Sequence, residues 1–272
     1  MDKLIDLIKY VLLGLVQGIA EILPISSSGH LIIFQTITDI KSDDLTVEIF
    51  LHIASLLALL IYFRKELIVL IKGFFNYLIH RKEESKKHFN WAIKIIIATI
   101  PAAIVGLLLE DIINDYFSSM LSVGILLLIN AFIIFYTSYA KGEKKVEEIS
   151  YLSSLIIGVF QSIAVLPGLS RSGTTIAGGK TQKLDKEEAS LFAFMLFIPV
   201  SVGAFIMKLD NLGEALSVNG VLLTISFIIA FISTYFALKF IFTLIRQGKF
   251  IYFAYYSIVV GLFSVIYALI NM

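Results

Sequence analysis

The sequence predicts an all-α polytopic membrane protein. Of its 272 residues, 58% are hydrophobic and only 16% are charged, and the mean hydropathy is +0.91. Soluble helices keep a polar stripe, whereas the stretch 221–237 is apolar or neutral on every face. Several stretches approach the roughly 20 apolar residues that cross a hydrocarbon core of ~30 Å. We therefore expect one membrane domain that includes residues 1–272.

The composition also excludes several classes of function. The chain has no cysteine, which excludes disulfides, thiolate catalysis and cysteine-based zinc sites. Its net charge is +1, and no basic block is large enough to follow a phosphate backbone, so nucleic acid is not an expected partner. The N-terminus lacks the pattern of a secretory signal, and we expect it to belong to the mature fold.

The first apolar segment is interrupted by a polar stretch. It covers about residues 4–22 and stops before Pro24, which disfavours helix in the residue that precedes it. Ser26 or Ser27 can then cap a short helix that ends at about Thr38. This helix has about half the length that a span requires. We predict a re-entrant helical hairpin whose broken backbone lines a protein-walled cavity.

Three candidate spans follow, and the links between them give an orientation. The link after the first span is rich in Lys and Arg, whereas Glu110–Ser118 carries three acidic residues and no basic one. The positive-inside bias places the first link in the cytoplasm and the second outside. The candidate spans are about 47–63, 91–109 and 119–140.

The same plan recurs in the second half of the chain. Residues 151–180 again indicate an apolar helix, a Pro-Gly break and a short polar helix, and candidate spans at about 189–207, 221–245 and 250–270 follow. Five residues recur at one constant offset, which we interpret as an internal repeat. They are Gln17, Ala20, Ser26, Ser28 and Gly29, recurring as Gln161, Ala164, Ser170, Ser172 and Gly173.

The predicted architecture is a re-entrant hairpin plus three transmembrane helices, repeated once. Residues 1–145 form the first repeat and residues 146–272 the second, which gives six full spans and two re-entrant hairpins. Three spans per repeat is an odd number, so the second copy is inverted relative to the first. Inverted repeats with broken helices place the working site where the broken segments meet. We expect the two polar motifs to share one cavity.

The first motif offers acid-base chemistry. Gln17 and Glu21 lie four residues apart, on one helical face, and His30 follows the break. A glutamate and a histidine beside hydroxyls can supply a general acid or base, a nucleophile and a metal ligand. The alternative is a buried structural Glu21–His30 pair. His52, in the next span, is interpreted as structural or interfacial.

The second motif offers anion binding. Arg171 stands between Ser170 and Ser172, and Gly173 and Thr174 follow. Planar guanidinium donors, free amides at a helix start and hydroxyls together form a receptor for a phosphate or diphosphate. The alternatives are a snorkelling arginine and hydroxyls that bond only to backbone carbonyls.

Together, QGIAEILPISSSGH (17–30) and LPGLSRSGTT (166–175) resemble the two signature motifs of the bacterial undecaprenyl-diphosphate phosphatases of the bacitracin-resistance type. The resemblance extends over essentially the whole chain. It implies hydrolysis of the terminal phosphate of a C55 isoprenyl diphosphate, which recycles the lipid carrier for peptidoglycan synthesis. It also implies a plasma-membrane location with the active site facing outside. The expected partners are this polyprenyl diphosphate and membrane lipid, and the oligomeric state stays open, a homodimer included.

With this resemblance in view, we hypothesise roles for single residues. Arg171 would clamp the diphosphate, and Ser27 is the candidate nucleophile, activated by His30 or Glu21. His30 as the nucleophile, or as the base for direct attack by water, stays open. Glu21 would act as a base or bind a divalent cation, Mg²⁺ or Ca²⁺. Gln17 stands where some family members have a second carboxylate, so whether this position shares in metal binding stays open. The substrate-binding candidates are Gln17, Ser26, Ser28, Gly29, Ser170, Ser172, Gly173 and Thr174.

A transporter is the competing class of function. Inverted repeats with opposed re-entrant hairpins are common among carriers, and a carrier of an anion or lipid phosphate would fit the same cavity. Release of phosphate by protein in detergent separates the two, because transport requires two compartments.

Overall fold

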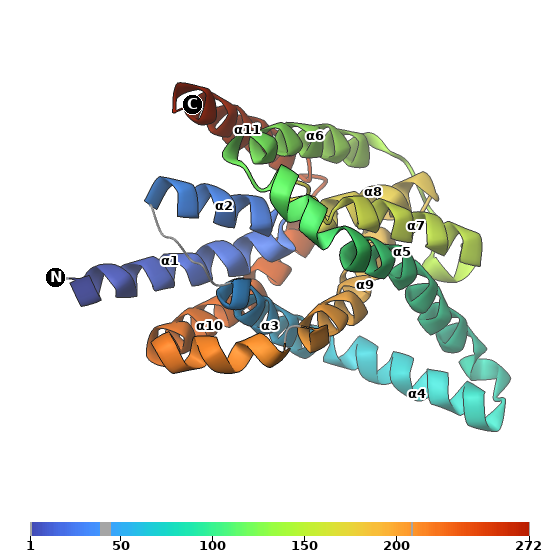
Figure 1. Cartoon of the computed structure of the whole chain (residues 1–272). Coiled ribbons are helices and arrows are strands. Elements are labelled where there is room, and N and C mark those ends of the chain that lie inside the picture. The colour runs from blue at the N-terminus through green and yellow to red at the C-terminus, as the bar shows by residue number, and fades with distance from the viewer. Residues whose placement is uncertain (1, 39–44, 208, 272) are drawn as a thin grey trace.

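The computed structural model describes residues 2–38, 45–207 and 209–271, and these ranges contain helices and no β-strand (Figure 1). Five helical stretches are long and apolar enough to cross a membrane: Glu83–Ile113, Met120–Tyr139, Lys186–Met207, Gly220–Arg246 and Tyr252–Ile270. The prediction of an all-helical polytopic membrane protein is thereby confirmed. The helices are α1 (Asp2–Ile22), α2 (Ser27–Thr38), α3 (Leu45–Tyr62), α4 (Arg64–His80), α5 (Lys86–Phe117), α6 (Met120–Tyr139), α7 (Tyr151–Ile163), α8 (Arg171–Thr181), α9 (Lys186–Met207), α10 (Leu209–Arg246) and α11 (Tyr252–Ile270).

Each of the six expected spans falls on a helix, but some helices are longer than expected. α5 continues through the acidic residues to Phe117, where a link outside the helix was expected. No Pro or Gly lies between residues 107 and 117, so nothing there ends the helix. α10 likewise begins at Leu209, ahead of the expected span.

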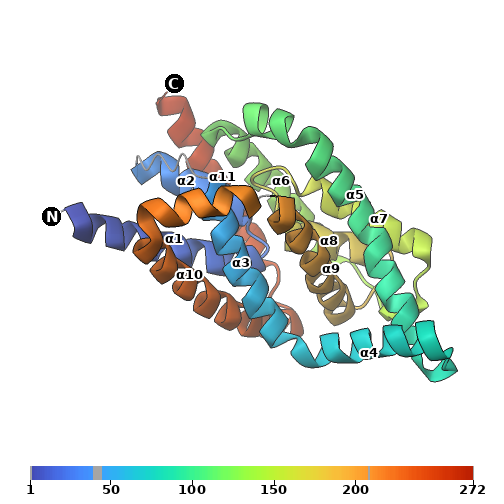
Figure 2. The same cartoon turned by 60° about the horizontal axis from the view of Figure 1, so that its bottom comes forward.

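The charged link between the first two expected spans contains the helix α4. Its buried side holds Leu70 and Gly73, and Gly73 lets His88 approach closely. Ile68, Ile71 and other apolar residues of α4 are exposed. Figure 2 shows α4 crossing from the end of α3 to the start of α5 along one edge of the molecule. The basic residues masked this helix in the sequence, because they interrupt its apolar positions.

Helices from the two halves of the chain pack against each other. α1 lies along α10, α7 along α5, and α6 along α11 (Figures 1 and 2). The first two pairs approach closely at glycines: a side chain at Gly14 would meet the Ser226 carbonyl, and one at Gly158 would meet the Ala98 carbonyl. Close backbone approach through small residues is the usual way in which membrane helices associate.

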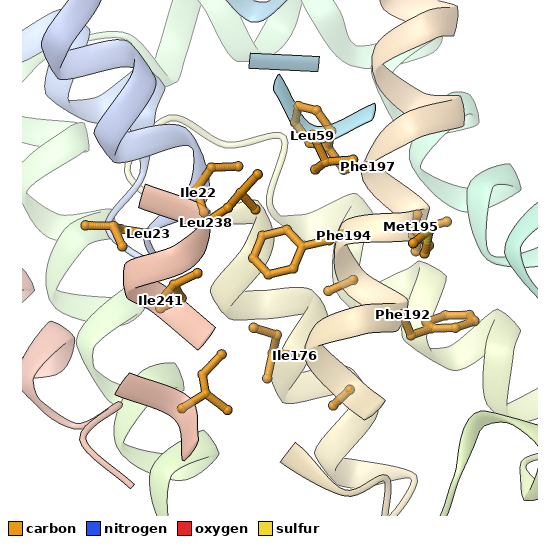
Figure 3. Close-up of a cluster of buried hydrophobic side chains, with 14 of the residues drawn as sticks. Ile22, Leu23, Leu59, Ile176, Phe192, Phe194, Met195, Phe197, Leu238 and Ile241 are labelled. Atoms are coloured by element: carbon orange, nitrogen blue, oxygen red, sulfur yellow. The ribbon is translucent and has the colours of Figure 1, made fainter. Parts of the chain in front are cut away.

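A buried apolar cluster lies beside the end of α1. Figure 3 shows Ile22 and Leu23, which follow directly after Glu21, together with Leu59 of α3, Phe194 and Phe197 of α9, and Leu238 of α10. All of these side chains are buried. The close packing fixes the chain directly after Glu21.

Candidate active site

The turn between α1 and α2 is shaped by Ser26. This residue has φ of 71°, in the left-handed region that non-glycine residues seldom adopt. Its Oγ accepts a hydrogen bond from the Gly29 amide at 3.2 Å, so Ser26 caps α2. The same Oγ accepts a second bond, at 2.9 Å, from the amide of Gly168 in the turn between α7 and α8. The two motifs, distant in sequence, are therefore in direct contact.

The turn between α7 and α8 repeats this design with other residues. Ser170 caps α8, and its Oγ accepts from the Gly173 amide at 3.1 Å. Here the positive φ, 109°, belongs to Gly168, and a Cβ at that position would lie 2.7 Å from Leu126 Cβ. Only glycine suits both the conformation and the space.

A buried side chain of α6 is hydrogen-bonded to both turns. Asn130 lies in α6 and is fully buried. Its Nδ2 donates to the Pro24 carbonyl at 3.0 Å, and its Oδ1 accepts from the Ser170 amide at 3.0 Å. Nδ2 also donates to Ser257 Oγ of α11 at 3.2 Å. Asn130 therefore fixes the distance between the two turns.

The Glu21 carboxylate is the centre of the site, and its side chain is only 2% exposed. Oε2 accepts from Ser27 Oγ at 2.6 Å and from Gln17 Nε2 at 2.8 Å. His52 Nε2 lies 3.1 Å from the same oxygen. Arg171 Nη1 lies 3.6 Å from the other oxygen, Oε1. A buried carboxylate requires such partners, because an unpaired charge away from water is costly.

Arg171 is the first residue of α8, and α9 supports its side chain. Its guanidinium carbon lies 4.9 Å from the centre of the Phe197 ring, and Nη1 donates to Ser201 Oγ at 3.3 Å. The side chain is 30% exposed, far more than that of Glu21. Stacking on the ring orients the guanidinium while leaving planar donors for an anion.

The structure directs His30 away from this cluster. Its Nδ1 lies 2.8 Å from the Ser26 carbonyl, which can only accept, so Nδ1 carries the hydrogen. The Nε2 lone pair then accepts from the Tyr256 hydroxyl at 2.7 Å, and the two rings stack. Within the described residues, His30 has no hydrogen bond or ion pair with Glu21 or Arg171, so the alternative of a structural Glu21–His30 pair is not what this structure shows.

The remaining predicted residues lie around the two turns. Ser28 Oγ is 3.5 Å from Ser26 Oγ, and Ser172 Oγ is 3.1 Å from Ser170 Oγ. Thr174 is buried, and its hydroxyl has no hydrogen-bond partner among the described residues. The two glycines allow the turns to touch: a Cβ at Gly29 would lie 3.0 Å from Gly168 Cα, and one at Gly173 would lie 3.1 Å from Pro24 Cβ.

Sequence reasoning missed four residues of this site. His52 and Asn130 carried a signal, because each is a polar group in the middle of an apolar helix. Phe197 and Ser201 carried none, because each is an ordinary residue of a membrane helix. Only the fold shows that they support Arg171.

The cluster combines three chemical capacities. The Ser27 hydroxyl is hydrogen-bonded to a carboxylate, which is the arrangement of a nucleophile and its base. Arg171 supplies a positive charge beside them. Two oxygens are suited to a hard cation: Glu21 Oε1, and Gln17 Oε1, which is buried without a hydrogen-bond partner among the described residues. The described part of the chain contains no group of three or more His, Asp or Glu residues that could hold a metal ion.

Comparison with known proteins shows which family this chain resembles. The sequence model of the family described as bacitracin resistance protein BacA matches residues 10–263. The chain is 39% identical over 265 residues to an undecaprenyl-diphosphatase of Oceanobacillus iheyensis, covering 96% of each chain. It is 36% identical over 269 residues to undecaprenyl-diphosphatase 2 of Bacillus thuringiensis, covering 98% of this chain and 100% of the relative. It is 38% identical over 267 residues to undecaprenyl-diphosphatase 1 of Shouchella clausii, covering 96% of each.

Proposed function

This chain belongs to the BacA family of bacitracin resistance proteins, and from this membership we infer that it is an undecaprenyl-diphosphatase. It hydrolyses undecaprenyl diphosphate to undecaprenyl phosphate and inorganic phosphate. The product returns to peptidoglycan synthesis as the lipid carrier. One observation carries the assignment at the site: the Ser27 hydroxyl, the Glu21 carboxylate and the Arg171 guanidinium meet in one cluster.

We propose that Ser27 is the nucleophile and Glu21 its base. Ser27 Oγ attacks the terminal phosphorus while its proton passes to Glu21 Oε2, 2.6 Å away. The bond from this phosphorus to the bridging oxygen breaks, and undecaprenyl phosphate leaves. Glu21 passes its proton to solvent and then takes one from a water molecule that attacks the phosphoserine. Ser27 Oγ leaves the phosphorus and regains a proton from Glu21, which completes the cycle.

The hydrogen bonds support Ser27 over His30 in this role. The Nε2 lone pair of His30 faces the Tyr256 hydroxyl, so it is occupied in this arrangement. Nδ1 carries a hydrogen toward the Ser26 carbonyl and has no free lone pair. Neither nitrogen is hydrogen-bonded to Ser27, whereas Glu21 is.

Arg171 is the diphosphate clamp of this mechanism. Its guanidinium presents planar donors that fit phosphate oxygens bidentately. Negative charge grows on these oxygens during the attack, and a preorganised cation beside them lowers the barrier. Because the Arg171 side chain is 30% exposed, it can turn from Glu21 Oε1 toward the substrate.

We further propose a divalent cation, Mg²⁺ or Ca²⁺, as a cofactor. Glu21 Oε1 and the unpartnered Gln17 Oε1 supply two oxygens of the kind that such ions prefer. Mg²⁺ sites commonly use one or two protein oxygens and take the rest from substrate phosphates and water. The ion would neutralise phosphate charge when bound.

The membrane arrangement is also a proposal. The packing of α1 on α10 and of α7 on α5, each with a close glycine, supports the inverted repeat of residues 1–145 and 146–272. α2 has 12 residues and α8 has 11, too few to cross ~30 Å of hydrocarbon, which supports two re-entrant hairpins. The basic segment around α4 supports a plasma-membrane orientation with that end in the cytoplasm and the first hairpin outside.

Phosphate release from undecaprenyl diphosphate by the purified chain in detergent tests the function. We expect turnover without a sealed membrane, stimulation by Mg²⁺ or Ca²⁺, and loss of turnover in Glu21→Gln. Absence of phosphate release from the folded wild-type chain, with and without these ions, would overturn the assignment. Transport of the lipid in sealed vesicles without hydrolysis would then favour a carrier.

A further inference from the structure

The Glu21 carboxylate has one close partner that neither hairpin supplies. His52 comes from α3, and its Nε2 lies 3.1 Å from Glu21 Oε2. The His52 side chain is 21% exposed, whereas that of Glu21 is 2% exposed. An ionised carboxylate only accepts hydrogen bonds, so Nε2 is the donor. This bond connects α3 to the proposed acid-base centre.

We propose that His52 is a positioning residue for Glu21 in turnover, an inference that rests on the proposed function. The two carboxylate oxygens have different tasks: Oε2 holds the Ser27 hydroxyl, and Oε1 faces Arg171. When Arg171 binds the diphosphate, its hold on Oε1 weakens. His52 then keeps Oε2 directed at Ser27 while the proton is transferred.

Gln17 cannot replace His52 in this task. Both bond to Glu21 Oε2, but Gln17 lies four residues before Glu21 on the same helix and moves with it. His52 is attached to a different helix, so of these two bonds only that of His52 fixes the carboxylate relative to the surrounding protein. A charge-assisted hydrogen bond of this kind is about twice as strong as a neutral one.

α3 is itself held against α1 one turn further along. Ser55 Oγ lies 3.0 Å from Thr234 Oγ1 of α10, and that hydroxyl donates to the Gly18 carbonyl of α1 at 3.0 Å. Because Thr234 donates to Gly18, Ser55 is the donor in the first bond. The chain of hydrogen bonds joins α3, α10 and α1 beside the His52–Glu21 contact, so His52 acts from a fixed support.

Three substitutions of His52 isolate its donor. His52→Gln keeps an amide N–H at a similar reach, His52→Asn keeps the amide but is too short, and His52→Leu removes the donor. We expect kcat of phosphate release to fall about tenfold to a hundredfold in His52→Leu and His52→Asn, with KM within about threefold of wild type. His52→Gln should recover kcat to within about fivefold of wild type. Thr243→Ala, which loses an exposed hydrogen bond to the Lys239 carbonyl within α10 and plays no part in the site, is the control and should keep kcat within about threefold.

The outcomes separate this proposal from the assignment of function. An inactive, folded wild-type chain overturns the function itself. An active wild type with unchanged kcat in His52→Leu, or with a raised KM alone, overturns only the positioning role. If His52→Leu does not fold, the Gln and Asn variants decide. The same kcat in both, whether near that of wild type or far below it, would contradict the proposal that a donor must reach Glu21.

Discussion

The two hairpins share a backbone design but carry opposite chemistry. In each, a serine caps the second helix through the amide three residues on: Ser26 through Gly29 and Ser170 through Gly173. The first helical residue after this cap is Ser27 in one hairpin and Arg171 in the other. The proposed nucleophile and the proposed anion clamp therefore occupy equivalent positions.

The turns that precede these caps differ in the residue that adopts the left-handed conformation. The first turn places Ser26 in the left-handed region, whereas the second places Gly168 there. Pro24 and Pro167 are correspondingly out of step by one residue. The cap has the same hydrogen bond in both turns while the loop before it differs, and the cap sets where the first helical side chain projects.

The largest expected effect removes the chemistry of the first hairpin. Ser27→Ala deletes the hydroxyl that is hydrogen-bonded to Glu21, so phosphate release should fall at least about a thousandfold. In the wild-type chain we expect mass spectrometry of quenched reactions to detect a phosphoryl group on Ser27. In Ser27→Ala this phosphoryl-enzyme should be absent. Ser28→Ala, one residue on, is the control and should keep the phosphoryl-enzyme. A phosphoryl group that remains, located on His30, would reverse the proposed roles.

The next effect weakens the second hairpin. Arg171→Lys keeps the positive charge but loses the planar pair of donors and the stacking on Phe197. We expect kcat/KM for undecaprenyl diphosphate to fall about a hundredfold. Ser201→Ala removes only one supporting bond of Arg171 and should cost less than about tenfold. Equal activity of Arg171→Lys and wild type would show that a simple charge suffices at this position.

A smaller effect tests whether the hairpins are packed alike. A side chain at Gly14 or Gly158 would collide with a backbone carbonyl of the facing helix, so either alanine variant should lose about 1–3 kcal/mol of stability. Gly203→Ala in α9 meets nothing within 4 Å and should leave the thermal midpoint unchanged or slightly raised. Loss of stability at only one of the two glycines would argue against equivalent packing.

Much of this molecule could be predicted from its sequence, because an apolar chain makes its exceptions visible. Glu21, Ser27 and Arg171 stand beside helix breaks where leucines would be expected, and ionisable groups at such places are costly unless used. The spans followed from the lengths of the apolar stretches. α4 did not, because its charges interrupt the apolar pattern, and neither did the far end of α5, because its acidic residues are typical of a link.

The neighbours of the site could not be predicted for a different reason. Helix periodicity tells which residues share a face but not which helix that face meets. His52 therefore looked structural or interfacial, although it contacts Glu21. The sequence groups His30 with Glu21 because both are ionisable residues beside one helix break, but in the structure Ser26 is left-handed and His30 faces α11.

The smallest expected effect follows from that orientation of His30. Tyr256→Phe removes the hydroxyl that donates to His30 Nε2 but keeps the ring stacked on the imidazole. If His30 is a partner of α11 and Ser27 is the nucleophile, phosphate release should change by less than about threefold. If His30 were the nucleophile or the base, freeing its lone pair would change the rate and its pH dependence strongly. Tyr255→Phe is the control, because Tyr255 is the neighbouring residue and its ring packs on Phe135. A large change in Tyr256→Phe alone would move the reacting centre from Glu21 toward α11, and the equivalence of Ser27 and Arg171 would then lose its functional meaning.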